Sequence, residues 1–203
     1  MTANNLRVTR GGGALESFLA RQRAKVADRL IPDENRSGRI LDIGCGSYPY
    51  FLSNIRFHEK HGLDRVPDSA VRSINGQEIF IRNFDIEARE ELPCDNEFFD
   101  VVTMLAVIEH IEPERLGTLL KEIRRILKPG GSYILTTPAA WTDRFLRLLA
   151  TVNLVSSEEI DEHKDIYNHE KIMRLLEENG FNRNDMRCGF FEAGMNLWAI
   201  ARR

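Results

Sequence analysis

Two glycines separated by one residue follow an apolar run that contains a carboxylate, at Ile40-Leu41-Asp42-Ile43-Gly44-Cys45-Gly46. Glycine at both places lets the main chain turn sharply and approach a ligand without a Cβ in the way. A second apolar run ends in an acid, at Gly62-Leu63-Asp64. It follows the glycines by about twenty residues, where nucleoside-binding α/β folds place a ribose-binding carboxylate. The two signals together predict a nucleoside site.

The remaining sequence supplies the elements that must position these residues. Strands are predicted over residues 39–43, 61–64, 78–83, 98–105 and 132–137, and helices over 14–31, 48–56, 113–127 and 169–179. The helices are recognised by apolar residues at helical spacing and by proline and glycine near their ends. Residues 185–192 and 196–201 are predicted as a closing hairpin. Strands that alternate with helices in this way predict an α/β fold with a parallel, doubly wound sheet.

Length and composition limit the class of protein. The 203 residues, 42% hydrophobic and 29% charged, fit one soluble domain. A net charge of −3 argues against broad nucleic-acid binding, which depends on neutralising phosphates. The three cysteines form no CxxC pair, and no apolar run approaches the ~20 residues of a membrane span. Since the N-terminus also lacks the pattern of a signal peptide, we expect a cytoplasmic protein.

Further motifs follow in an order that is typical of one family. They are FD (84–85) followed by LP (92–93), FFDVV (98–102), EHI (109–111) and LKPGG (127–131). With ILDIGCG and GLD, they make the chain from Ile40 onward resemble the class I S-adenosylmethionine-dependent methyltransferases, particularly the small single-domain type. The resemblance implies a Rossmann-like seven-stranded sheet, mostly parallel, with an antiparallel C-terminal hairpin. It also implies one domain over residues 1–203, with S-adenosylmethionine as the cofactor.

The resemblance assigns the glycine-rich turn to the methionine end of the cofactor. Gly44 and Gly46, with Cys45 between them, would bring backbone groups against the amino acid portion. Asp42 would interact with its ammonium group. Tyr48 departs from the family pattern, because it stands where the third glycine would fall.

The resemblance assigns the ribose and adenine to residues after the next two strands. Asp64 would accept both ribose hydroxyls, since a carboxylate offers only acceptors in a planar fork. Asp85 and Ile86 would bind adenine through a carboxylate and a backbone N–H. Arg65 and Leu105 complete the predicted cofactor site. For Asp85 a helix-capping or turn role stays open.

Two histidines are candidates for a general base, because imidazole titrates near neutrality. His110 follows the fourth predicted strand, where the family lines the pocket beneath the reactive methyl, and His163 lies in an insertion over residues 139–167. We expect this insertion to form a lid over a small-molecule acceptor, with a sugar or natural-product hydroxyl as one candidate. A structural or solvated role stays open for both histidines. His58 and His61 have no third ligand nearby, so no metal is expected.

Two other functions are weighed against methyl transfer. An NAD-dependent oxidoreductase is disfavoured, because Pro49 stands where a dinucleotide motif needs its third glycine and Asp42 would repel a diphosphate. A non-catalytic S-adenosylmethionine-binding protein that regulates a partner through residues 139–165 stays open. Binding of the cofactor without product formation would be its signature.

Overall fold

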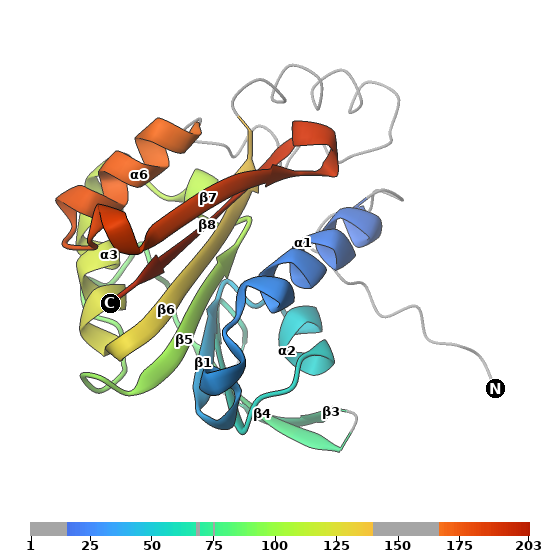
Figure 1. The fold of residues 1–203 in the computed structure, drawn as a ribbon. Coiled ribbons are helices and arrows are strands. Elements are labelled where there is room, and N and C mark those ends of the chain that lie inside the picture. Colours follow the sequence, from blue (N-terminus) through green and yellow to red (C-terminus); the bar gives the residue numbers. More distant parts are fainter. Residues whose placement is uncertain (1–15, 68–69, 75, 140–166) are drawn as a thin grey trace.

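The computed structural model describes residues 16–67, 70–74, 76–139 and 167–203, and an eight-stranded sheet forms the centre of this part (Figure 1). The strands are β1 (Arg39–Ile43), β2 (Glu59–Asp64), β3 (Ala70–Ile74), β4 (Gln77–Asn83), β5 (Phe99–Leu105), β6 (Leu127–Pro138), β7 (Met186–Phe191) and β8 (Asn196–Arg202). The α-helices are α1 (Glu16–Leu30), α2 (Tyr50–Asn54), α3 (Pro113–Ile126) and α6 (His169–Glu178). Single turns of 3₁₀ helix lie at η1 (Asp33–Ser37), η2 (Ile108–His110), η3 (Arg183–Asp185) and η4 (Glu192–Gly194).

The strand order is β3-β4-β2-β1-β5-β6-β8-β7. The five central strands, from β4 to β6, run parallel, and β8 and β7 form an antiparallel hairpin beside β6. The chain leaves β1 towards β2 on one side and returns to β5 on the other. A crevice is therefore expected at the carboxyl ends of β1 and β5. The predicted Rossmann-like sheet and its C-terminal hairpin are confirmed.

The predicted number of seven strands is wrong, because β3 adds an eighth at the edge of the sheet. β3 pairs with β4, in the antiparallel sense. Its sequence, AVRSI, is short and half polar, so it lacks the apolar run by which the buried strands were recognised. The dipeptide Asn75-Gly76 that follows is a strong hairpin signal, and it identifies this strand in retrospect.

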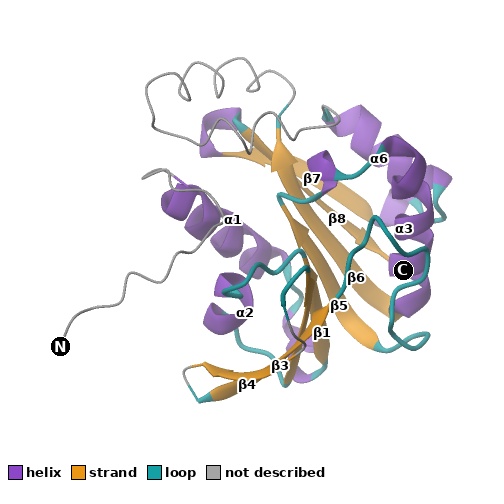
Figure 2. Ribbon diagram, turned by 180° about the vertical axis from the view of Figure 1, so that it is seen from behind, coloured by secondary structure: helices purple, strands orange, loops and turns teal. Residues whose placement is uncertain are grey.

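Helices cover both faces of the sheet, as Figures 1 and 2 show: α1 and α2 on one face, α3 and α6 on the other. On the first face, Ala24 and Ala27 of α1 are buried against apolar residues of β1, β5, β6 and β8. Their small side chains let the helix axis approach the sheet. On the second face, α3 buries the leucines and isoleucines that recur along one side of it.

The sixth strand begins earlier than the predicted boundary at Ser132. Leu127 pairs with Phe99 and Ser132 with Val101, so the residues between them form an irregular stretch within β6. Lys128 binds Asp100 there at 2.7 Å. LKPGG therefore ends α3 and also opens the strand.

The predicted lid lies almost wholly outside the described residues. Only its two ends, Ala139 and Tyr167, are described, and they pair with each other by a parallel bridge. The Tyr167 side chain is buried. In the described part of the chain, no helix is both long and apolar enough to cross a membrane.

Candidate functional site

The glycine-rich turn leaves the carboxyl end of β1 and bends back towards β2. The Gly44 N–H donates to Leu63 O at 2.8 Å, and the φ angles of Gly44 and Gly46 are 78° and 77°. A Cβ on Gly44 would lie 2.4 Å from Cγ2 of Val107, which follows β5. Because both the backbone angle and the space exclude a side chain, only glycine fits at residue 44.

Asp64 at the end of β2 is joined directly to this turn. Its side chain is buried, and Oδ2 accepts the Gly46 N–H at 2.6 Å. Arg72 of β3 donates to Ser47 O on the other side of the turn. The predicted methionine-end and ribose-end residues therefore form one hydrogen-bonded unit, in which Asp64 fixes the loop.

Asp42 lies on β1, the strand beside β2, and its buried side chain contacts β5. Thr103 Oγ1 donates to its Oδ1 at 2.6 Å. Burial raises the pKa of Asp42 to about 7, the Thr103 hydrogen bond opposes the rise, and the nearby Asp64 carboxylate adds to it. A cation beside Asp42 would stabilise its charged form. Asp42 and Asp64 together therefore make this end of the sheet a site for a ligand that carries a positive group and hydroxyls.

Asp85 follows β4 and contacts residues of its own turn. Oδ1 accepts the Glu87 N–H at 2.9 Å, and Oδ2 lies 3.2 Å from Nε of Arg65, which also pairs with Glu87 at 3.0 Å. These contacts match the turn role left open by the sequence, and they place Arg65 beside Asp85. Ile86 is partly buried and packs against the core of the α3 face.

Cys45 and Leu105 lie at the carboxyl ends of β1 and β5. The Cys45 side chain is buried, and its Sγ would lie 2.6 Å from a Cβ on Gly62, so it packs into the core and leaves only its backbone for a ligand. Burial raises the pKa of this thiol above its usual range. Leu105 is partly exposed, and the next residue, Ala106, has a φ of 57°. A left-handed alanine is uncommon and is enriched at functional sites.

The sharp turn at Ala106 leads into η2, where His110 lies. His110 is partly exposed at the carboxyl end of the sheet, as predicted. Glu109, the neighbour of His110 in the chain, is buried and accepts a hydrogen bond from Thr137 Oγ1 at 3.1 Å. His163 lies outside the described residues. The structure thus brings His110 to the same edge of the sheet as Asp42 and Asp64.

Sequence reasoning missed Thr103, Thr137 and Arg72. Thr103 and Thr137 stand in otherwise apolar strands, and a buried hydroxyl in such a strand must find a partner, which was the available signal. Arg72 belongs to the missed strand β3, so nothing in the sequence pattern linked it to the glycine-rich turn.

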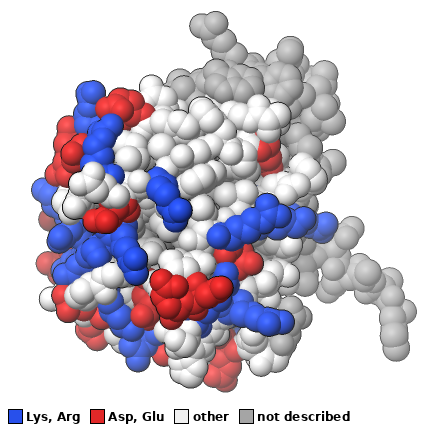
Figure 3. Space-filling model, in the orientation of Figure 1, with Lys and Arg blue, Asp and Glu red and all other residues white. Residues whose placement is uncertain are grey.

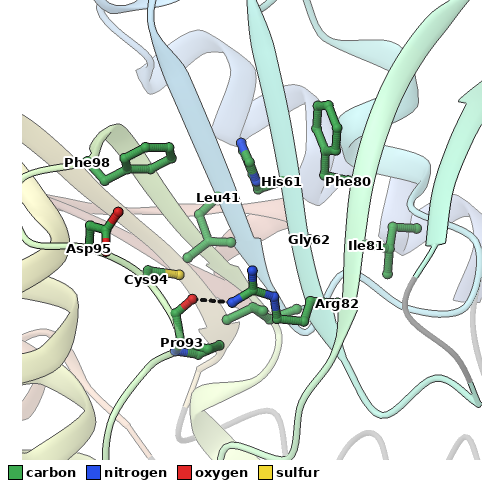
Figure 4. A pocket seen from close by; sticks show the side chains of 11 residues that line it. Leu41, His61, Gly62, Phe80, Ile81, Arg82, Pro93, Cys94, Asp95 and Phe98 are labelled. Atoms are coloured by element: carbon green, nitrogen blue, oxygen red, sulfur yellow. Dashed lines mark hydrogen bonds between the residues drawn. The ribbon is translucent and has the colours of Figure 1, made fainter.

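A separate cavity of about 580 Å³ lies on the α3 face, against the middle of β1, β2 and β4. Figure 4 shows His61, Phe80 and Phe98 around it, with Arg82 donating to Pro93 O. It contains none of the predicted site residues. Across the described residues, no three His, Cys, Asp or Glu side chains gather as the ligands of a metal ion would.

The strand order, the glycine-rich turn and the two strand-end acids define a Rossmann-like protein of the nucleoside-cofactor class. Residues 15–184 match the family model described as a methyltransferase domain, so the chain belongs to this family. The predicted family, the class I S-adenosylmethionine-dependent methyltransferases, is thereby confirmed, and S-adenosylmethionine is the cofactor of this class.

Solved structures with the same fold carry the same description. An S-adenosylmethionine-dependent methyltransferase from Archaeoglobus fulgidus is 18% identical, with 94% of this chain and 95% of that chain covered and a TM-score of 0.65. A Thermotoga maritima protein described as a possible histamine N-methyltransferase is 21% identical, with 89% and 86% covered and a TM-score of 0.63. Likeness at these identities shows the fold alone.

Curated relatives act on different acceptors. A sterol 4-C-methyltransferase of Caenorhabditis elegans is 32% identical over 132 residues, which are 61% of this chain and 37% of that protein. A tRNA N(3)-cytidine methyltransferase of Gallus gallus is 25% identical over 129 residues, which are 58% and 35%. The match covers little more than a third of either relative.

Proposed function

We propose that this chain transfers the methyl group of S-adenosylmethionine to a small-molecule acceptor that carries a hydroxyl group. The observation that carries the proposal is the pair of buried acids, Asp42 and Asp64, around a turn that only glycine can form. Thr103 Oγ1 donates to Asp42 and the Gly46 N–H donates to Asp64, so both buried carboxylates are held in place beside the turn.

The residues of this edge fit the cofactor in three places. Asp42 would bind its ammonium, the backbone at Gly44 and Gly46 its carboxylate, and Asp64 its ribose. The Gly46 N–H already binds Oδ2 of Asp64, so the ribose would share that carboxylate with the turn. Asp85 would bind adenine with lone pairs that its contacts with Arg65 and Glu87 do not use.

When bound, S-adenosylmethionine supplies an activated methyl group on a sulfonium that is a good leaving group. The main task of the protein is then to hold the acceptor in line with that methyl and to exclude water. His110, at the carboxyl end of β5, would take the proton of a hydroxyl acceptor. The insertion over residues 139–167 is proposed to cover the acceptor as a lid.

Calorimetry tests the cofactor assignment. S-adenosylhomocysteine should bind, and NAD should not compete, because Asp42 repels a diphosphate and Pro49 replaces the third glycine of a dinucleotide motif. Asp185→Ala, a change at an exposed acid of η3, serves as the matched control for changes at Asp64. Tight binding of NAD would contradict the assignment.

The acceptor class is tested with S-adenosylmethionine labelled in its methyl group. Incubation with separated small-molecule and RNA fractions should label only the small-molecule fraction. On the face in Figure 3, basic and acidic side chains are interspersed at the left and bottom beside a wide neutral area, which does not favour a nucleic acid there. Labelled RNA would replace the proposed acceptor, and binding without any labelled product would favour the non-catalytic alternative.

A further inference from the structure

A second polar cluster lies at the carboxyl end of β6, on the face that α1 covers. It consists of Glu192 in η4, Asn196 and Trp198 of β8, and Thr136 of β6. Asn196 and Trp198 are two residues apart and point to the same face, and Thr136 is opposite Trp198. Trp198 packs against the core on the α1 side, which fixes the face. None of these four residues belongs to the predicted site.

The cluster holds two buried oxygens that lack a hydrogen-bond partner within the described part of the chain. Asn196 Nδ2 donates to Oε2 of Glu192, so the second oxygen, Oε1, is left over. Thr136 Oγ1 is also buried and unsatisfied. A buried polar atom without a partner is unfavourable, and native structures rarely keep one without a reason.

The backbone at Glu192 adds a second unfavourable feature. Glu192 and Ala193 have φ angles of 51° and 55°, the left-handed region in which glycine or asparagine is preferred. The strained hairpin corner directs the carboxylate into the cluster, where Asn196 holds one of its oxygens. Strain of this kind clusters at ligand-binding sites.

The charges around Glu192 favour a neutral ligand. Burial raises the pKa of the Glu192 carboxyl, while the nearby positive charge of Arg23 on α1 and the Asn196 hydrogen bond oppose the rise. Arg23 would repel an ammonium group placed beside the same carboxylate. A ligand hydroxyl can donate to Glu192 Oε1, and the Thr136 hydroxyl is a second group on this face that can donate or accept a hydrogen bond.

We propose that Glu192, positioned by Asn196, binds a hydroxyl group of the acceptor, with Thr136 as its neighbour and the Trp198 indole as an apolar wall. The cluster lies at the carboxyl edge of the sheet, two to three strands from the Asp42 site along the order β1-β5-β6-β8. Glu192 would therefore bind a part of the acceptor remote from the reacting atom. This role rests on the proposed function, because it assumes that the acceptor lies over this edge.

Ligand-observed NMR on the full chain saturated with S-adenosylhomocysteine tests the proposal. Three probes share a benzyl ring, chosen as an apolar partner for the Trp198 indole: benzyl alcohol, benzyl methyl ether, which has no donor, and benzylamine, which is cationic. Benzyl alcohol should bind the most tightly. Glu192→Gln should weaken the binding of benzyl alcohol by about fivefold, because the charged acceptor becomes neutral. The binding of the ether, which has no donor, should be unaffected.

Two further variants separate binding from folding. Glu192→Gly suits the left-handed backbone, so it should raise the melting temperature. Because it also removes the carboxylate, it should weaken the binding of benzyl alcohol by at least about tenfold. Glu97→Gln makes the same chemical change at another left-handed glutamate, with φ 52°, which pairs with Arg203 at 2.8 Å. It should leave probe binding unchanged.

The outcomes are distinct from those for the proposed function. If S-adenosylhomocysteine does not bind the wild type, the proposed function fails. If it binds, and benzyl alcohol either fails to bind or binds wild type and Glu192→Gln equally, only the role of Glu192 is overturned. Preference for benzylamine over the alcohol would overturn the choice of a hydroxyl.

Discussion

Replacing Asp42 by asparagine should stabilise the cofactor-free protein at pH 8. The pKa of Asp42 is raised from an ordinary value of 3.8 to about 7, with burial as the largest cause. A rise of about 3 units corresponds to about 4 kcal/mol of folding free energy when the group is fully ionised. Asparagine has the same shape as aspartate and can accept the hydrogen bond from Thr103, but it carries no charge that must be buried. We therefore expect Asp42→Asn to be more stable by up to about 4 kcal/mol at pH 8.

The sign of this pH dependence follows from which state holds the proton. Below pH 3.8, Asp42 is protonated in both the folded and the unfolded chain, so it has no effect on stability. Between pH 3.8 and about 7 the unfolded chain releases this proton and the folded protein keeps it. The wild type therefore loses stability as the pH rises through this window, and the loss is complete above it.

Urea unfolding of both proteins at pH 5 and pH 8 measures the effect. Other carboxyls also have pKa values that differ from their ordinary ones, including Glu59 and Glu122, whose pKa values are lowered. Their contributions cancel in the difference between wild type and variant. The difference should grow from pH 5 to pH 8. Introducing Thr103→Val into both proteins should widen this difference in stability, because the hydrogen bond from Thr103 lowers the pKa of Asp42. Thr103→Ser keeps that hydrogen bond and should preserve the difference.

A difference between wild type and Asp42→Asn that is the same at both pH values would refute this reasoning. It would mean that Asp42 titrates normally in the folded protein and that its surroundings are more polar than the buried contacts indicate. In the proposed site the ammonium of S-adenosylhomocysteine would lie beside Asp42, so saturation with this ligand should reduce the advantage of the variant at pH 8.

Three further changes test the same edge of the sheet. Asp64→Ala should weaken S-adenosylhomocysteine binding by about 1–3 kcal/mol in calorimetry, since it removes the predicted ribose acceptor and the partner of Gly46; unchanged affinity would remove Asp64 from the site. Gly44→Ala should lower the free energy of unfolding by about 1–3 kcal/mol, because its Cβ would meet Val107 in a left-handed backbone; a stability equal to wild type would argue against this loop geometry. His110→Ala should lower kcat about 10²–10⁴-fold with cofactor affinity unchanged; full kcat and an unaltered pH profile would leave His110 as part of the pocket wall.

The sequence alone determined the class of fold, and it also predicts which residues form the cofactor end of the site. The runs ILDIGCG and GLD carry this information locally, because a buried parallel strand needs a continuous apolar run and a ligand-facing turn needs glycine. The same reasoning failed for β3, because an edge strand is buried on one side at most and its residues need not be apolar. It also placed the start of β6 too late, at Ser132. The pairing of Leu127 with Phe99 that begins this strand is a contact between distant parts of the chain.

Only the tertiary structure decided how the site residues act on one another. The hydrogen bond from Gly46 to Asp64 spans 18 residues, and the one from Thr103 to Asp42 spans 61. The raised pKa of Asp42 comes from burial, which no residue spacing reveals. The cluster at Glu192 likewise unites residues from a hairpin corner and two strands, with Arg23 of α1 nearby. The sequence specifies which groups can do chemistry, and the packing of distant elements specifies which of them meet and in what charge state.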